Sequence, residues 1–176
     1  MAGDEHASPW RDRGWVLSVA RLRLDLYRLV AAIFASGAEG EAYFGGPLAD
    51  LVADCQREEI EQLLVSVAAM TRVVLDQHSP RPPEARAECG ALSPDTSDER
   101  PLTLREACNK ILHAEARGFE WNSDFDPRLA GLSGAVYLSG KQFEKRWKAR
   151  LEVVAFVKAI ASLTAGRPDE AGPVGA

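Results

Sequence analysis

Three polar residues of different chemistry recur at every fourth position in one short segment: Arg105, Asn109 and His113. Because an α-helix turns by about 100° per residue, a helix here stacks them along one edge, away from Leu104 and Ile111. Arginine offers a fixed positive fork for phosphate oxygens, and histidine exchanges a proton near neutral pH. The spacing therefore predicts a phosphate-binding group. Since every amphipathic helix needs a polar side, an ordinary solvated face is the alternative.

The helix that carries these residues has a clear start. Thr103 and Glu106 have the spacing of a capping box, in which each side chain satisfies a backbone N–H that the first helical turn leaves free. An apolar stripe follows, formed by Leu104, Ala107, Cys108, Ile111 and Leu112. We expect this helix to end at Gly118.

The segment Cys108-Asn-Lys-Ile-Leu-His113 resembles the motif of the HEPN (higher eukaryotes and prokaryotes nucleotide-binding) superfamily. That motif has an arginine, usually a polar residue after it, and then a histidine beyond a short spacer. The resemblance implies that His113 is the motif histidine and Asn109 the polar residue. It also implies a helical bundle, often dimeric, in a family where many members are metal-independent ribonucleases of toxin–antitoxin and antiviral systems.

One departure from the family pattern bears on catalysis. In the mechanism that the resemblance implies, histidine activates a ribose 2′-hydroxyl while arginine stabilises the charged phosphate. The arginine position here is Cys108, which is neutral, and only Arg105 or Lys110 could substitute from nearby. We therefore expect a protein that binds RNA or a nucleotide in a bacterial defence or toxin–antitoxin setting without cleaving RNA. If it is an enzyme, the expected activity is a metal-independent endoribonuclease using His113 and Arg105.

A basic run surrounds Trp147 near the end of the chain, formed by Lys141, Lys145, Arg146, Lys148 and Arg150. Basic residues beside an aromatic ring are typical of surfaces that follow a nucleic-acid backbone. Lys145, Arg146 and Lys148 therefore join Asn109 and Lys110 as candidate nucleic-acid or phosphate ligands. The alternative is the solvated first turns of a helix, because Trp147 aligns at helical spacing with apolar residues further along.

Apolar periodicity predicts helices over residues 10–36, 47–78, 103–118 and 141–164. Together they indicate an all-α protein, an up-and-down four-helix bundle with a small hairpin or turn-rich insert before the last helix. The predicted hairpin lies at 129–139, around Ser133 and Gly134. We expect a single domain over 10–165, a flexible N-terminus over 1–9, a mobile proline-rich linker over 79–100 and a disordered tail over 166–176.

The last helix is apolar nearly all round from Leu151 onward. Such a helix either occupies the centre of a bundle or is covered by a partner. We therefore expect a homodimer. The rival hypothesis for function is a helical module for protein–protein interaction or dimerisation that has no catalytic activity.

Composition excludes several classes of site. The 176 residues carry a formal net charge of −5, so overall electrostatics do not draw the chain to nucleic acid or to an anionic membrane. Three cysteines without paired spacing, and no Glu-x-x-His pair, predict no metal and no cofactor. The N-terminus is acidic, and the longest apolar run, residues 29–35, is far shorter than the roughly 18 residues of a membrane span. We expect a cytoplasmic protein.

Overall fold

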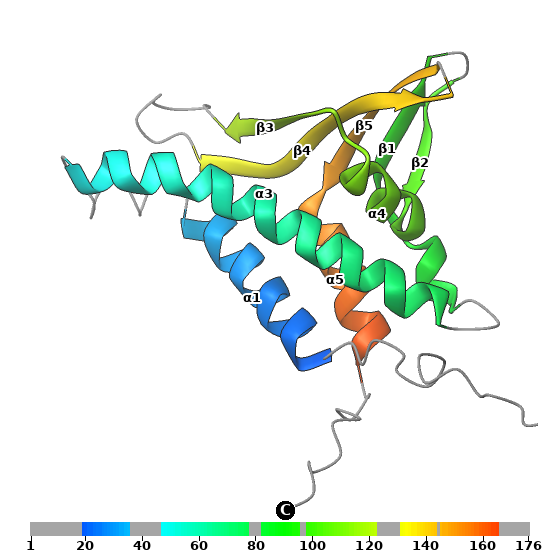
Figure 1. The fold of residues 1–176 in the computed structure, drawn as a ribbon, viewed down its shortest axis with the longest axis horizontal. Helices are drawn as coiled ribbons and strands as arrows, with labels where there is room; N and C mark the ends of the chain where they lie inside the picture. Colours follow the sequence, from blue (N-terminus) through cyan, green and yellow to red (C-terminus); the bar gives the residue numbers. More distant parts are fainter. Residues whose placement is uncertain are drawn as a thin grey trace, which may run out of the picture.

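The structure is a computed structural model, and its fold combines α-helices with a β-sheet (Figure 1). The structure describes residues 19–35, 47–77, 82–95, 98–122, 131–143 and 145–165. The predicted N-terminal segment 1–9 and tail 166–176 lie outside the described residues.

The described residues form helices α1 (Val19–Ala35), α3 (Pro47–Asp76), α4 (Leu104–Leu112) and α5 (Val153–Thr164), with a short 3-10 helix, η1 (Pro83–Arg86). The strands are β1 (Glu88–Pro94), β2 (Arg100–Thr103), β3 (Ala116–Asn122), β4 (Gly131–Gln142) and β5 (Lys145–Glu152). The prediction of an all-α four-helix bundle is therefore wrong, and the fold is α/β.

The sheet is antiparallel throughout and has the strand order β2-β1-β5-β4-β3. Helices α1, α4 and α5 contact one face of it, and α3 packs against α1 and α4 in the same layer (Figure 1). Their apolar faces bury a continuous core that includes Leu22, Leu64, Leu104 and Phe156. The molecule thus has two layers, with the core between the helices and one face of the sheet.

The basic segment predicted to begin the last helix forms the middle of this sheet instead. Residues 145–152 are β5, and only residues 153–164 of the predicted helix are helical. Along β5, Trp147, Ala149 and Leu151 are buried and the residues between them point to the other face. This two-residue alternation is the signature of a strand with one buried face.

The stretch predicted as a mobile linker contains structure that the sheet requires. It includes η1 and β1, and β1 lies between β2 and β5. Gly90 is needed there, because its φ of +139° is unfavourable for other residues and an added Cβ would collide with the carbonyl oxygen of Arg150. A non-local partner strand therefore orders a segment whose composition indicates a linker.

The predicted hairpin at 129–139 is replaced by one long strand. The described residues of that segment, 131–139, belong to β4, which runs continuously over residues 131–142. Gly134 adopts a φ of +84° without ending the strand. The turn of the observed hairpin lies instead between β4 and β5, at Phe143.

Three of the predicted helices are present, and the described part of the first, predicted over 10–36, is α1. The helix predicted over 47–78 is α3, and the capping box that starts α4 is present, with Glu106 N–H donating to Thr103 Oγ1. Helix α4 ends at Leu112, earlier than predicted, because β3 begins at Ala116. The start predicted for the first helix, residues 10–18, lies outside the described residues.

The apolar last helix is central within the chain itself. Phe156 and Ile160 of α5 are fully buried, and α5 contacts α1 and strands β1, β4 and β5. This position accounts for its apolar character without a partner, and homodimerisation stays a prediction. In the part of the chain described here, no helix is long and apolar enough to cross a membrane.

A close approach between β4 and β5 gives a test of the sheet. A Cβ added at Gly140 would lie 2.7 Å from Cζ2 of Trp147 and 2.9 Å from the carbonyl oxygen of His113. Because the Trp147 ring is buried, Gly140→Ala should lower the free energy of unfolding by about 1–3 kcal/mol in urea denaturation. Gly118→Ala is the control, since its nearest neighbour, Cβ of Tyr137, is 3.9 Å away. Equal losses in both variants would contradict this packing.

Candidate functional site

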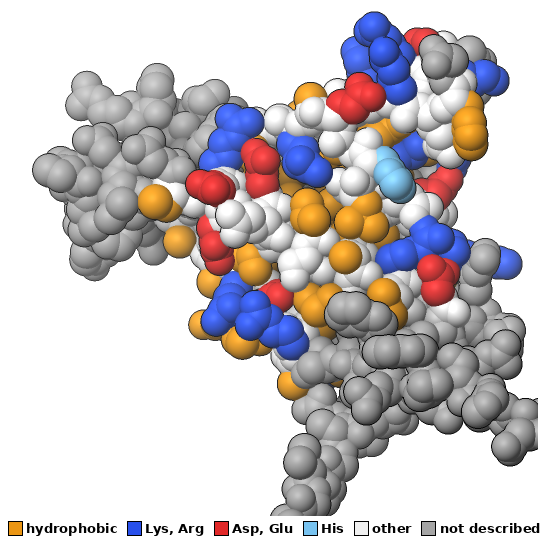
Figure 2. Space-filling view, in the orientation of Figure 1, with side chains coloured by type: hydrophobic (Ala, Val, Ile, Leu, Met, Phe, Trp, Pro, Cys, Tyr) orange, Lys and Arg blue, Asp and Glu red, His pale blue; other side chains and the backbone are white. Residues whose placement is uncertain are grey.

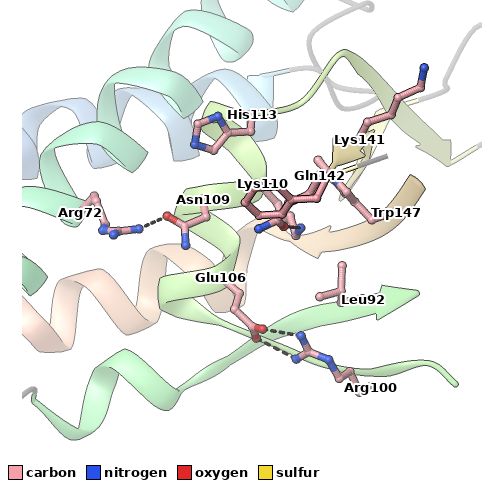
Figure 3. Close-up of a pocket in the computed structure, with 11 residues that line it drawn as sticks. Arg72, Leu92, Arg100, Glu106, Asn109, Lys110, His113, Lys141, Gln142 and Trp147 are labelled. Atoms are coloured by element: carbon pink, nitrogen blue, oxygen red, sulfur yellow. Dashed lines mark hydrogen bonds and ion pairs between the residues drawn. The ribbon is translucent and has the colours of Figure 1, made fainter. Parts of the chain in front are cut away.

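A polar pocket of about 750 Å³ opens where α4 meets the ends of α3, β2 and the β4–β5 hairpin. Figure 3 shows the side chains that line this pocket. Figure 2 shows basic side chains gathered at the end of the sheet where β4 turns into β5. The pocket is lined by Arg72, Leu92, Arg100, Glu106, Asn109, Lys110, His113, Lys141, Gln142, Phe143 and Trp147. Four of these are lysine or arginine, and Glu106 is the only acid among them.

Helix α4 brings three predicted site residues to this pocket: Asn109, Lys110 and His113. Asn109 and His113 lie one turn apart, and the His113 N–H donates to the carbonyl oxygen of Asn109 at the end of the helix. The imidazole is exposed and lies at the rim of the pocket (Figure 3). Among the described residues, none makes a hydrogen bond or ion pair with this imidazole, so a ligand can reach it.

Arg105, the guanidinium predicted to act with them, lies outside the pocket lining. Its Nη1 lies 2.6 Å from Oδ1 of Asp76, at the end of α3. Asp76 also binds Arg72, whose Nε is 2.8 Å from Oδ2. The hydrogen bond from Arg72, with a smaller one from Arg105, holds the pKa of Asp76 below its ordinary value. One carboxylate thus fixes two guanidiniums from different helices.

Arg72 is a pocket residue that the sequence does not reveal, as are Arg100, Gln142 and Phe143. Its Nη1 donates to Oδ1 of Asn109, and the two side chains point toward one another (Figure 3). A cation therefore lies beside Asn109, but α3 supplies it and α4 does not. The Arg72–Asp76 spacing on α3 is the one sequence signal that could have suggested a fixed guanidinium here.

Lys110 lies deeper in the pocket, against the sheet. Its Nζ is 3.1 Å from Oε1 of Gln142 and 4.3 Å from the centroid of the Trp147 ring. The ring face attracts the ammonium group electrostatically. Partial burial nevertheless lowers the pKa of Lys110, because desolvation disfavours the charged form. An anionic ligand here would offset this desolvation by stabilising the charged form of the ammonium group.

The charge of Arg100 is balanced inside the pocket. Both of its Nη atoms bind the Glu106 carboxylate, at 2.5 and 3.0 Å. The hydrogen bond from Arg100 holds the pKa of Glu106 below its ordinary value, and Glu106 raises the pKa of Arg100. This pair closes the lower end of the pocket (Figure 3), so the unbalanced positive charge lies toward Lys110 and Arg72.

The residue at the motif's arginine position takes no part in the site. Cys108 is fully buried on the core-facing side of α4, and burial raises the pKa of its thiol to about 12. A neutral, inaccessible thiol neither attacks a substrate nor stabilises a phosphate.

The basic residues of β5 form a separate group. Lys145, Arg146 and Lys148 do not line the pocket, and Arg146 and Lys148 point to the opposite face of the sheet from Trp147. Lys141 of β4 touches the pocket, yet its side chain extends away from the pocket centre (Figure 3). The two sets of predicted ligands therefore lie on different faces. Within the described ranges, no three His, Cys, Asp or Glu residues group as metal ligands.

Comparisons of the chain with protein-family models, with curated proteins and with solved structures find no match. The HEPN resemblance therefore stays a prediction resting on residues 108–113. The all-helical bundle that it implied is not the fold observed.

The Arg100–Glu106 pair predicts a pH-dependent contribution to stability. Glu106→Gln keeps the capping geometry, because glutamine also serves in a capping box, but removes the ion pair. Near neutral pH the variant should be less stable by about 0.2–1 kcal/mol, as for exposed pairs. Because the folded pKa is depressed, this difference should shrink as the pH falls from about 4.3, the ordinary glutamate pKa, through the lowered one.

The measurement is urea denaturation at several pH values. The matched control is Glu59→Gln, an exposed glutamate on α3. A stability difference that persists unchanged into strong acid would show that Glu106 does not act through its charge.

Proposed function

We propose that the pocket at α4 binds a phosphate-bearing ligand of nucleotide size and that the protein does not cleave RNA. The observation that carries the proposal is the concentration of positive charge at this pocket in a chain whose net charge is −5. The only acid in the lining, Glu106, is already bound to Arg100. Among the described residues, no carboxylate pairs with Lys110, and Arg72 shares the single carboxylate of Asp76 with Arg105. Lys110 and Nη2 of Arg72, the guanidinium nitrogen that neither Asp76 nor Asn109 binds, are thereby left for an anion, and the exposed imidazole of His113 lines the same pocket.

Two features favour a nucleotide over a bare phosphate ion. The volume of about 750 Å³ is typical of small-molecule sites, which span about 300–1,000 Å³. Phe143 lies in the pocket lining, at the hairpin turn, and is 91% exposed. Its φ of +49° is unfavourable for a bulky residue. A large aromatic ring kept exposed in a strained turn is consistent with stacking on a base.

The absence of RNA cleavage is proposed from the same geometry. Cleavage requires a base and a cation that act together on one phosphate. Arg105 is directed to Asp76, and Arg72 is fixed at Nε by Asp76 and at Nη1 by Asn109. Lys110 lies deeper in the pocket, at Gln142 and Trp147, whereas the imidazole of His113 lies at the rim, so this geometry does not favour a cation and a base acting together on one phosphate. The HEPN resemblance adds the proposed setting, bacterial defence or a toxin–antitoxin pair.

Calorimetric titration with AMP and with inorganic phosphate tests the binding proposal. Lys110→Gln and Arg72→Gln should each weaken AMP binding by about tenfold or more, since a hydrogen bond to a charged group contributes about 1.5–3 kcal/mol. Lys158→Gln, an exposed substitution on α5, is the control and should not change the affinity. No AMP binding by the wild type would overturn the proposal, and equal affinity for phosphate alone would remove the role of the base.

A separate assay addresses catalysis. The wild type and His113→Ala are incubated with RNA in the presence of a chelator, and the fragments are resolved on a gel. We expect no cleavage that depends on His113. Cleavage by the wild type that disappears in the variant would show that the protein is a ribonuclease.

A further inference from the structure

Among the described residues, none covers the face of the sheet opposite the helices, which we call the open face, and this face is hollowed. Among the described elements, every helix lies on the other side of the sheet (Figure 1). A hollow of about 620 Å³ crosses β1, β5, β4 and β3 on the open face. It is distinct from the pocket at His113, with which it shares no lining residue.

Small side chains form the floor of this hollow. In the register of the sheet, Ala91 lies opposite Arg150, Ser93 opposite Lys148, and Ser139 opposite both Lys148 and Ala116. Gly118 lies opposite Tyr137 and has no side chain to fill the space beside it. Residues this small on β1, β4 and β3 leave a shallow hollow around the longer side chains of Tyr137, Lys148 and Arg150. Glu99 also lines the hollow, and its carboxylate accepts a hydrogen bond from Ser93 Oγ at 3.0 Å.

Tyr137 supplies an aromatic surface in this hollow. The residue is 46% exposed, and its hydroxyl is 2.7 Å from Oε1 of Glu120. Glu120 also accepts hydrogen bonds from Ser133 at 2.7 Å and Arg150 at 3.2 Å, which fix the carboxylate. The ring is therefore held in place from its polar end, and a planar group can stack on it.

Positive charge extends along the same face toward the hairpin. Arg146 and Lys148 alternate with buried residues of β5, and Lys141 lies directly opposite Arg146. Like charges directly opposite each other destabilise a sheet. No described carboxylate forms an ion pair with Lys141, Arg146 or Lys148, whereas Arg150 is balanced by Glu120 and Glu152. An anion along this edge would relieve the repulsion.

We propose that the open face of the sheet binds single-stranded nucleic acid. Bases stack on Tyr137 over the small-residue floor, and the phosphates follow Lys148, Arg146 and Lys141 toward the hairpin. Extended strands with an aromatic ring and a basic track are a recurrent way to bind single strands with little sequence preference. This site is additional to the nucleotide pocket, and either can be absent without the other.

Fluorescence anisotropy with a labelled oligouridylate of about 12 nucleotides tests the proposal, since such sites cover about 4–16 nucleotides. Tyr137→Ala should weaken binding about 5- to 100-fold, in line with the contribution of stacking one base. Tyr137→Phe keeps the ring and should remain within about threefold of the wild type. A Tyr137→Ala variant that binds the oligonucleotide as tightly as the wild type would show that the ring does not stack on a base, which overturns the proposal.

The charges are tested by the double variant Arg146→Gln/Lys148→Gln. Because each contact with a single-strand phosphate contributes about 0.7 to the salt dependence, the slope of log affinity against log salt should fall by about 1.4. The matched control, Arg23→Gln/Lys158→Gln, removes two exposed charges from the helical layer and should leave the slope unchanged. An unchanged slope in the first variant, or no oligonucleotide binding by the wild type, would overturn the proposal.

Two further measurements separate the alternatives. AMP titration of the Tyr137→Ala and double variants should give the affinity of the wild type, so failure at the pocket and failure at the open face are distinguishable. Sedimentation of the same variants tests a second copy of the chain as the occupant. A wild-type dimer that dissociates in the Tyr137→Ala variant, without oligonucleotide binding, would assign this face to dimerisation and overturn the proposal.

Discussion

Successive side chains of a strand point to opposite faces of its sheet. In β5 this alternation separates the side chains that pack in the core from the basic side chains on the open face. Trp147, Ala149 and Leu151 enter the core, while Arg146, Lys148 and Arg150 occupy the open face. Because β5 is the middle strand, its pleat also sets the orientation of β1 and β4, which pair with it. A slip of one residue would place three cations in the core, so the register is strongly fixed.

Trp147 connects the core to the pocket. Its ring is buried beneath α4 and lies under the ammonium group of Lys110. The opposite residue on β4 is Gly140, and nothing larger fits between the ring and the end of α4. The same close packing thus fixes the distance between α4 and the sheet, and with it the width of the pocket that Asn109, Lys110 and His113 line.

Sequence reasoning succeeded where the signals are local. The capping box of Thr103 with Glu106 and the apolar stripe of α3 lie within a few turns of helix, so they could be recognised directly. β5 could not be recognised in this way, because Trp147 and Leu151 fit a helical spacing of four as well as a strand spacing of two. The decision comes from β1 and β4, whose pairing with β5 is not visible in the local pattern. β1 itself has a proline-rich, polar environment in the sequence and is ordered by its neighbours.

Prediction of the candidate site from the sequence is limited in the same way, because contacts between distant segments decide where its charges lie. Helical periodicity placed Asn109 and His113 on one edge, and both line the pocket. It also placed Arg105 there, but the carboxylate of Asp76 directs that guanidinium away from the pocket and fixes Arg72 beside Asn109 instead. Two guanidiniums sharing one carboxylate keep a net positive charge at the junction of α3 and α4. Such a balance depends on which residues meet in space, so the charge of a site cannot be read from one helix.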